Sequence, residues 1–405
     1  MSPVRVTIAL LLGIGACRSN DTTTGSGDGI ANDDGGVAFE GGLPPVPTIP
    51  DGYDGGLGIG LVDVPDTPCA PRGGALHTIL AKDATPAGFR DLRHVGTRIV
   101  ATATDGSGFL LADADGNGGS FVKTALVRGS ADVLGDQVFF AGSTSTTGVG
   151  VQAYSSTGQP AAGVIALADE PRNEPVRIGV SGNAALVVWP TFNGMRARAT
   201  NAMAPIAATY DLALTHKTST ASAAVTPAIA PDLFAAVFSG DDTGAGHLTA
   251  YARGSTTGRA QDPFALFVGP TARHVVGIAR AKDAYAMLAG VDDVDGIGSY
   301  AMLVLLDPYG RLATAGLRLL GTTDGAAIAA NDAGTEFGVV ARRKDGDQNV
   351  LAFRTFDTKG APLSGWVCLD APSPEPDLGG AIGAQGQGYA IVMRAADGST
   401  ALALP

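Results

Sequence analysis

The chain has 405 residues, of which 45% are hydrophobic, 16% are charged and 58 are glycine. Long charged helices need more Glu, Lys and Arg than this, so the composition favours short strands joined by glycine-containing turns. The formal net charge of −12 argues against nucleic acid as a partner, because phosphate backbones are also anionic. An acidic surface instead suits a soluble protein, or one that meets cations or basic partners.

The first 17 residues have the order of an export signal. Arg5 supplies a positive charge, and residues 8–14 form an apolar run too short to span a bilayer as a mature helix. The run ends in Ile14–Cys17 (IGAC), which resembles the lipobox of bacterial lipoproteins, although the usual lipobox has Leu where Ile14 stands. The resemblance implies lipid attachment at Cys17 and a location in the bacterial cell envelope, at the outer membrane or cell surface. The alternative is an ordinary signal peptide with a cysteine near its cleavage site.

Residues 18–68 show no hydrophobic period and are rich in Gly, Asp and Pro. Such a stretch cannot bury enough apolar surface to offset its conformational entropy. We therefore expect a disordered tether between the lipid and a folded domain that covers residues 69–405.

A unit of four short strands and three hairpin turns recurs along the folded domain, and its clearest copy lies at 327–369. The period is between about 40 and 50 residues. The second strand of each unit is a continuous small or apolar run, as expected for a strand covered on both faces. Six complete units lie at roughly 91–125, 131–168, 176–214, 226–268, 274–321 and 326–370.

Four-stranded units in series at this period predict an all-β fold, a β-propeller of seven blades. One unit cannot cover both faces of its own sheet, so neighbours must pack against it and the ring must close. The seventh unit, 379–405, holds only three strands, and an N-terminal strand at 76–81 is available as its outer strand. A pair of β-sandwiches would also show short strands and glycine turns. Six units in series plus a matching partial unit favour the propeller.

Two cysteines of the folded domain are expected to be neighbours on the rim. Cys69 precedes the closing strand of blade seven, and Cys368 lies in the outer strand of blade six. An exported protein meets an oxidising compartment, so we predict a Cys69–Cys368 disulfide. It would close a loop of about 300 residues and stabilise the fold by a few kcal/mol. The alternative is two free thiols in strands that do not meet.

The turn between the second and third strands is acidic in most units. In propellers these turns share one face of the disc with the connections between blades, and propeller families commonly bind ligands there. A ring of carboxylates could hold Ca²⁺ or a basic partner. Asp-Gly is also a favoured hairpin pair whatever the function, so turn chemistry alone can explain the pattern. The residues concerned are Asp105, Asp241, Asp242, Asp292, Asp293, Asp295, Asp345, Asp347 and Asp397.

One further stretch, Asp113–Gly118, matches the first half of a calcium-binding loop. The Glu that such a loop needs at its twelfth position is replaced by Thr124. The stretch also occupies the same place in its unit as the plain turns 307–310 and 357–360, so we interpret it as a turn. The five histidines are scattered and show no metal-ligand spacing.

The sequence contains no nucleophile elbow, phosphate-binding loop or dinucleotide fingerprint, and we assign no catalytic residue and no cofactor. The pattern favours a monomeric, lipid-anchored propeller that acts as a non-enzymatic binding or scaffold module for an envelope protein or a glycan. One alternative is a hydrolase or lyase that acts on a polysaccharide through carboxylates in the propeller funnel. Another is a purely structural subunit of an envelope assembly.

Overall fold

The computed structural model describes the chain from Leu61 to Pro405 with short internal gaps. Residues 1–60, 66, 74–75, 85, 145–147, 170–174, 192–193, 202, 215–221, 230–232, 243–245, 270–272, 292–298, 320–321, 346–347, 370–378 and 396 are not described. The predicted export signal with Cys17, and residues 18–60 of the predicted tether, thus lie outside the described residues. Within the described part the one helix is a short 3-10 turn, η1 (Lys82–Ala84), and no helix there has the length and apolar character needed to cross a membrane.

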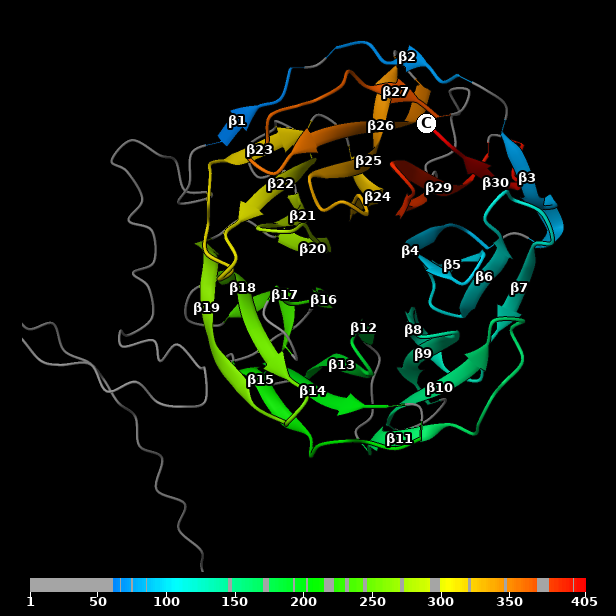
Figure 1. The fold of residues 1–405 in the computed structure, drawn as a ribbon. Helices are drawn as coiled ribbons and strands as arrows, with labels where there is room; N and C mark the ends of the chain where they lie inside the picture. The colour runs from blue at the N-terminus through cyan, green and yellow to red at the C-terminus, as the bar shows by residue number, and fades with distance from the viewer. Residues whose placement is uncertain are drawn as a thin grey trace, which may run out of the picture. The chain divides into compact units, whose positions relative to one another are not determined.

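Seven sheets, each with four antiparallel strands, stand around a common centre as the blades of a β-propeller (Figure 1). Within each of the first six blades the strands follow one another in chain order from the centre outward. The predicted all-β, seven-bladed fold is confirmed. The hydrophobic pattern explains the order, because the second strand of a blade is covered on both faces: all seven residues of β21 (Tyr285–Val291) are buried.

The strands fall into four concentric sets. The inner strands are β4 (Phe89–Val95), β8 (Val127–Leu134), β12 (Arg177–Ser181), β16 (Ser222–Pro227), β20 (Arg273–Arg280), β24 (Thr322–Ala330) and β28 (Gly380–Gln385). The second strands are β5 (Arg98–Ala103), β9 (Gln137–Ser143), β13 (Ala184–Thr191), β17 (Leu233–Asp242), β21, β25 (Glu336–Asp345) and β29 (Gly388–Arg394). The third strands are β6 (Gly108–Asp113), β10 (Val149–Ser155), β14 (Gly194–Thr200), β18 (Gly246–Ser255), β22 (Tyr300–Leu306), β26 (Gln348–Asp357) and β30 (Thr400–Ala403). The outer strands are β7 (Ser120–Lys123), β11 (Ile165–Ala168), β15 (Tyr210–Leu214), β19 (Ala260–Gly269), β23 (Gly316–Leu319), β27 (Val367–Cys368) and β3 (His77–Leu80).

The ring closes in blade seven, where an N-terminal strand completes a C-terminal sheet. Strand β3 pairs antiparallel with β30, and Thr78 lies opposite Ala401. The three other strands of that sheet come from the last residues of the chain, so the two ends of the repeat region share one blade. This is the closure predicted from the segment 76–81.

Two further N-terminal strands run along the outer edges of the ring, and the sequence analysis did not foresee them. Strand β1 (Leu61–Asp63) adds a fifth, parallel strand to blade five beside β23, and β2 (Ala70–Pro71) does the same in blade six beside β27. Leu61–Asp63 falls within the predicted tether of residues 18–68, and this part of that range is instead paired with the propeller. The reason is tertiary: an exposed outer edge offers free backbone N–H and C=O groups to any segment that reaches it.

The predicted disulfide joins Cys69 to Cys368, with their Cα atoms 5.3 Å apart. Cys69 immediately precedes β2, and Cys368 ends β27, so the parallel pairing of these two strands brings the sulfurs together. The indole of Trp366 is buried beside Cys69. The bond therefore fastens the N-terminal segment to the outer edge of blade six.

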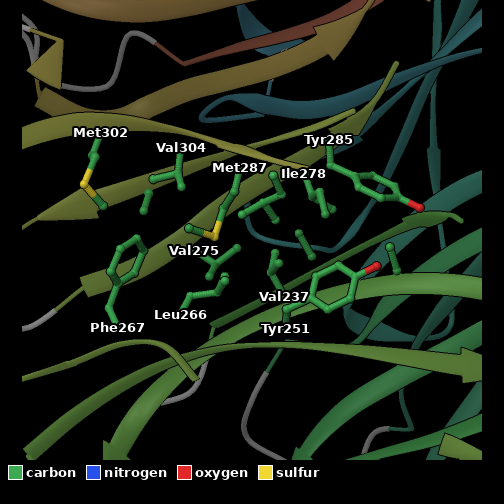
Figure 2. Packing of buried hydrophobic residues seen from close by; sticks show 14 of the residues in the cluster. Val237, Tyr251, Leu266, Phe267, Val275, Ile278, Tyr285, Met287, Met302 and Val304 are labelled. Carbon is green, nitrogen blue, oxygen red and sulfur yellow. The ribbon is translucent and has the colours of Figure 1, made fainter. Parts of the chain in front are cut away.

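Neighbouring blades are held together by apolar side chains that interleave between their sheets. Figure 2 shows the cluster between blades four and five, where Tyr251 from β18 and Tyr285 from β21 lie with their ring centroids 6.2 Å apart. The Tyr285 hydroxyl accepts the backbone N–H of Ile229 at 2.6 Å. Each fully buried aromatic ring removes a large apolar area from water, so the interfaces between blades hold much of the core.

The turn that joins the third strand to the outer strand fits closely against the preceding blade. In blade five the Asp307 carboxylate accepts the N–H groups of Tyr309 and Arg311 at 2.9 and 2.8 Å. Gly310 closes this turn at φ +84°, and a Cβ at that position would overlap the ring of Tyr251 in blade four. Glycine is needed for both reasons, the left-handed backbone and the close approach.

Candidate functional site

The inner strands enclose two adjoining cavities at the centre of the ring. The narrower one, here called the neck, measures about 30 Å³ and lies where the inner strands begin. The wider one measures about 410 Å³ and lies where the inner strands end. Both cavities are lined by Arg93, Ile278 and Ile328, so they form successive parts of one axial channel.

Three arginines line the neck, two from β4 and one from β12. They are Arg90, Arg93 and Arg177, and the one carboxylate among the described lining residues is Asp91. Two of these arginines come from blade one and one from blade three, so only ring closure brings them together. The three guanidinium groups form a positive cluster in a chain whose formal net charge is −12.

Arg90 and Asp91 form an ion pair on a strained piece of backbone. Asp91 has φ +53°, at a bulge in the pairing of β4 with β5. Its Oδ2 atom lies 3.9 Å from the Nε of Arg90, which is too far for a hydrogen bond. The Nε–H of Arg90 is buried without a hydrogen-bond partner, while its Nη2 donates to the carbonyl of Gly129 at 2.5 Å. Left-handed backbone in a non-glycine residue is uncommon and often marks functional sites.

Arg93 and Asp132 form the second ion pair of the channel. The Nε of Arg93 lies 3.1 Å from Oδ1 of Asp132, which also accepts the N–H of Val133 at 2.8 Å. The other carboxylate oxygen accepts the N–H of Val180 at 2.9 Å. Burial raises the pKa of Asp132, and the attraction of Arg93 with these two backbone bonds opposes the rise without cancelling it. Burial also opposes the charge of Arg93, but the charges of Asp132 and Asp91, with the hydrogen bond to Asp132, together outweigh it and raise the pKa of Arg93.

Arg177 is held in place by backbone carbonyl groups. Its Nε donates to the carbonyl of Ala223 at 3.0 Å and its Nη1 to that of Val176 at 3.4 Å. Burial, helped by the positive charge of Arg90, lowers the pKa of Arg177 to about 9, although the charge of Asp91 opposes the change. The guanidinium of Arg177 therefore remains protonated at neutral pH.

The wider cavity is lined by both apolar and polar side chains. Ile278 and Ile328 form part of the wall, and the polar groups include His94 and Asn331. The Nε2 atom of His94 is buried without a hydrogen-bond partner. Its size is in the range of small-molecule sites, and four of its lining side chains are charged, those of Arg93, Asp132, Arg280 and Asp332.

The predicted ring of acidic turns is only partly within the described residues. Asp105 and Asp397 are exposed, and each accepts the backbone N–H two residues further on, from Ser107 at 2.9 Å and from Ser399 at 2.8 Å. Hydrogen bonds to Ser399 also lower the pKa of Asp397. Both residues thus perform the turn chemistry that the sequence offered as the simpler explanation. Asp241, Asp242 and Asp345 end the second strands β17 and β25, and Asp292, Asp293, Asp295 and Asp347 lie outside the described residues.

These turns belong to different blades, and the described part of the chain holds no group of three or more His, Cys, Asp or Glu side chains placed to bind a metal ion. Asp105 does reach the channel electrostatically: burial lowers the pKa of Arg90, and the charges of Asp91 and, to a smaller extent, Asp105 oppose that change. The calcium-like stretch Asp113–Gly118 is a turn, as predicted: Oδ1 of Asp115 accepts the N–H of Asn117 at 3.0 Å, and Asp113 pairs with Arg98 at 3.3 Å.

The sequence analysis did not identify the three arginines of the neck as site residues. A signal was present, because Arg stands near the start of both β4 and β12. An isolated arginine in a strand matches none of the sequence patterns of paired carboxylates, metal ligands or nucleophiles.

No protein-family model and no curated protein matches this sequence. Among solved structures, hydrazine synthase of Kuenenia stuttgartiensis matches with 12% identity and a TM-score of 0.55, over 83% of this chain and 99% of that one. A streptogramin B lyase matches with 15% identity and a TM-score of 0.46, over 82% of this chain and 97% of that one. The SapL1 lectin in complex with α-methyl fucoside matches with 11% identity and a TM-score of 0.40, over 65% and 87%. At such low identity the likeness concerns the propeller fold alone.

Proposed function

We propose that this chain is a lipid-anchored protein of the bacterial cell envelope whose propeller acts as a non-enzymatic binding module for a protein or a glycan. The lipobox-like segment that ends in Cys17 supports the anchor. The Cys69–Cys368 disulfide supports export, because such bonds persist in oxidising compartments.

The observation that carries the binding role is how the N-terminal segment is fastened to the ring. Strands β1, β2 and β3 join the outer edges of blades five, six and seven, and the disulfide adds a covalent link. A force on the N-terminus therefore acts on the outer strands of the ring, while the inner strands and the channel stay undisturbed. This construction suits a rigid platform that is presented on a tether.

Two experiments test the proposal. Metabolic labelling with a radioactive fatty acid should label the full chain, and Cys17→Ala should abolish the label, whereas a variant that lacks both Cys69 and Cys368 keeps it. Cross-linking in intact cells, followed by recovery of the tagged protein and mass spectrometry, should yield an envelope protein or glycan. A chain that carries no label, or that is recovered alone from the envelope, contradicts the proposal.

A second candidate function, a hydrolase or lyase acting on a polysaccharide, is favoured by one observation. Three carboxylates, those of Asp91, Asp132 and Asp332, line the axial channel, and paired carboxylates can cleave glycosidic bonds. A turnover screen over polysaccharides decides between the two functions. Reproducible product release that is lost in Asp91→Asn would replace the binding role with the enzymatic one.

A further inference from the structure

We propose that the neck of the channel binds the carboxylate of a small organic anion, with the body of the ligand in the wider cavity. This site is independent of the lipid anchor and of any partner that meets the surface of the ring.

The first support is the balance of charge in the neck. Arg93 is matched by Asp132, whose two carboxylate oxygens are also occupied by backbone N–H groups. Two guanidinium groups, those of Arg90 and Arg177, are then left with Asp91 as the one carboxylate lining the neck. Asp105 lies on an exposed turn, where water screens its charge far more than it screens charges inside the channel. The neck therefore carries an excess positive charge that a bound anion would neutralise.

The second support is a hydrogen-bond donor that lacks an acceptor. The Nε–H of Arg90 is buried and unpartnered, and the nearby Asp91 carboxylate, at 3.9 Å, does not supply the missing bond. A buried donor without an acceptor is costly, and carboxylate oxygens are the acceptors that guanidinium groups bind best. A ligand carboxylate that displaces Asp91 from this position can accept from Arg90 after a small rotation of the guanidinium group.

The third support is size. A cavity of about 30 Å³ admits a group no larger than a carboxylate or a water or two. The adjoining 410 Å³ is enough for the body of one sugar or one amino acid, beside the apolar side chains of Ile278 and Ile328 and the charged ones of Arg280 and Asp332. The two volumes together thus favour a small molecule with one anionic end over a polymer or a folded partner.

Titration calorimetry on the full chain tests this with three probes: acetate, D-glucuronate, and D-glucose as the neutral counterpart of glucuronate. We expect glucuronate to bind more tightly than acetate, and glucose not to bind. Arg177→Gln should weaken glucuronate binding at least about tenfold, because one charge-assisted contact is lost. Arg196→Gln is the matched control: it removes the same charge from the same blade, at an exposed pair with Asp211, and should leave binding unchanged.

Asp91→Asn provides a second test, whose expected result would not be seen if the neck residues had a purely structural role. Asparagine tolerates left-handed backbone at least as well as aspartate, so the fold is kept, while the internal carboxylate that competes with the ligand is removed. Glucuronate should then bind several-fold more tightly than to the wild type. Equal binding of glucose and glucuronate, unchanged binding in Arg177→Gln, or no binding of either anion to Asp91→Asn at millimolar concentration would overturn the proposal. A failure of fatty-acid labelling at Cys17 would leave it standing.

Discussion

Arg93 and Asp132 join adjacent blades through a half-buried ion pair, with Nε and Oδ1 3.1 Å apart. Asp132 also accepts the backbone N–H of Val180, so a single carboxylate connects the inner strands of blades one, two and three. Ser130 also connects blades two and three: its hydroxyl donates to the carbonyl of Val176 and accepts the N–H of Ile178. An ion pair and several hydrogen bonds thus connect the inner strands on the arginine-rich side of the channel. This network fixes the positions of the neck residues.

Removing one partner of this pair should be strongly destabilising. In Asp132→Ala, Arg93 loses its counterion and two backbone N–H groups lose their acceptor, so we expect the free energy of unfolding to fall by about 2–4 kcal/mol. Arg93→Met should cost less, because the carboxylate of Asp132 keeps its two backbone N–H donors, those of Val133 and Val180. Urea unfolding of both single variants and the double variant gives the coupling energy. A coupling near zero would show that the two side chains stabilise the ring independently.

The disulfide should stabilise the seam of the ring. Replacing both Cys69 and Cys368 by Ser frees a loop of 299 residues, and we expect a loss of about 3–5 kcal/mol in the free energy of unfolding. Thermal unfolding with and without reductant checks this. Reductant should lower the midpoint of the wild type to that of the variant and leave the variant unchanged. Two separately alkylated thiols in a non-reducing peptide map would rule out the bond.

Two glycines with similar φ angles allow the cost of backbone strain to be measured separately from the cost of overpacking. Gly135 has φ +63° and open space where a Cβ would lie, while Gly310 has φ +84° and the ring of Tyr251 there. Gly135→Ala should cost about 1–2 kcal/mol for the left-handed backbone alone. Gly310→Ala should cost about 1–3 kcal/mol more, because the methyl group overpacks the interface of blades four and five. Equal losses in chemical unfolding would mean that the turn can move away from Tyr251.

The pairing of β1 with blade five should depend on pH. Two hydrogen bonds from Arg318, at 2.5 and 2.8 Å, hold the pKa of Asp63 below its ordinary 3.8. A lowered carboxyl pKa gives stability that is present above pH 3.8 and lost as the pH falls through the lower, folded-state value. The side chain of Asp63 is exposed, so solvent screening limits the effect to about 0.5 kcal/mol.

The measurement for this pair is the difference in unfolding free energy between the wild type and Asp63→Asn at neutral pH and near pH 3. We expect the difference to vanish in acid. Asp136→Asn, an exposed aspartate in the turn between β8 and β9, serves as the control and should show no such difference at either pH. A difference for Asp63→Asn that persists in acid would show that its cause is not the charge of the carboxylate.

Much of this architecture can be predicted from the sequence because it depends on local patterns of residues. The continuous apolar run of each second strand, the turn residues at fixed positions and the spacing of the units predict a propeller. The missing outer strand of the last unit predicts the closure by 76–81. Once the order of the blades is known, the positions of Cys69 and Cys368 predict their bond. Each of these inferences needs only residues that are close in sequence, or the simple rule that a ring must close.

The channel, and the pairing of β1 and β2 with the outer edges of blades five and six, depend on the tertiary structure. Arg90, Arg93 and Arg177 come from two blades separated by a third, and nothing in the local sequence of β4 or β12 says that they share a cavity. Leu61–Asp63 has the composition of its neighbours in the predicted tether, yet it forms a strand because the free edge of β23 and the guanidinium of Arg318 lie within reach. Local patterns specify which segments become strands, whereas the pairing of edges and the gathering of charges depend on distances that only the closed ring sets.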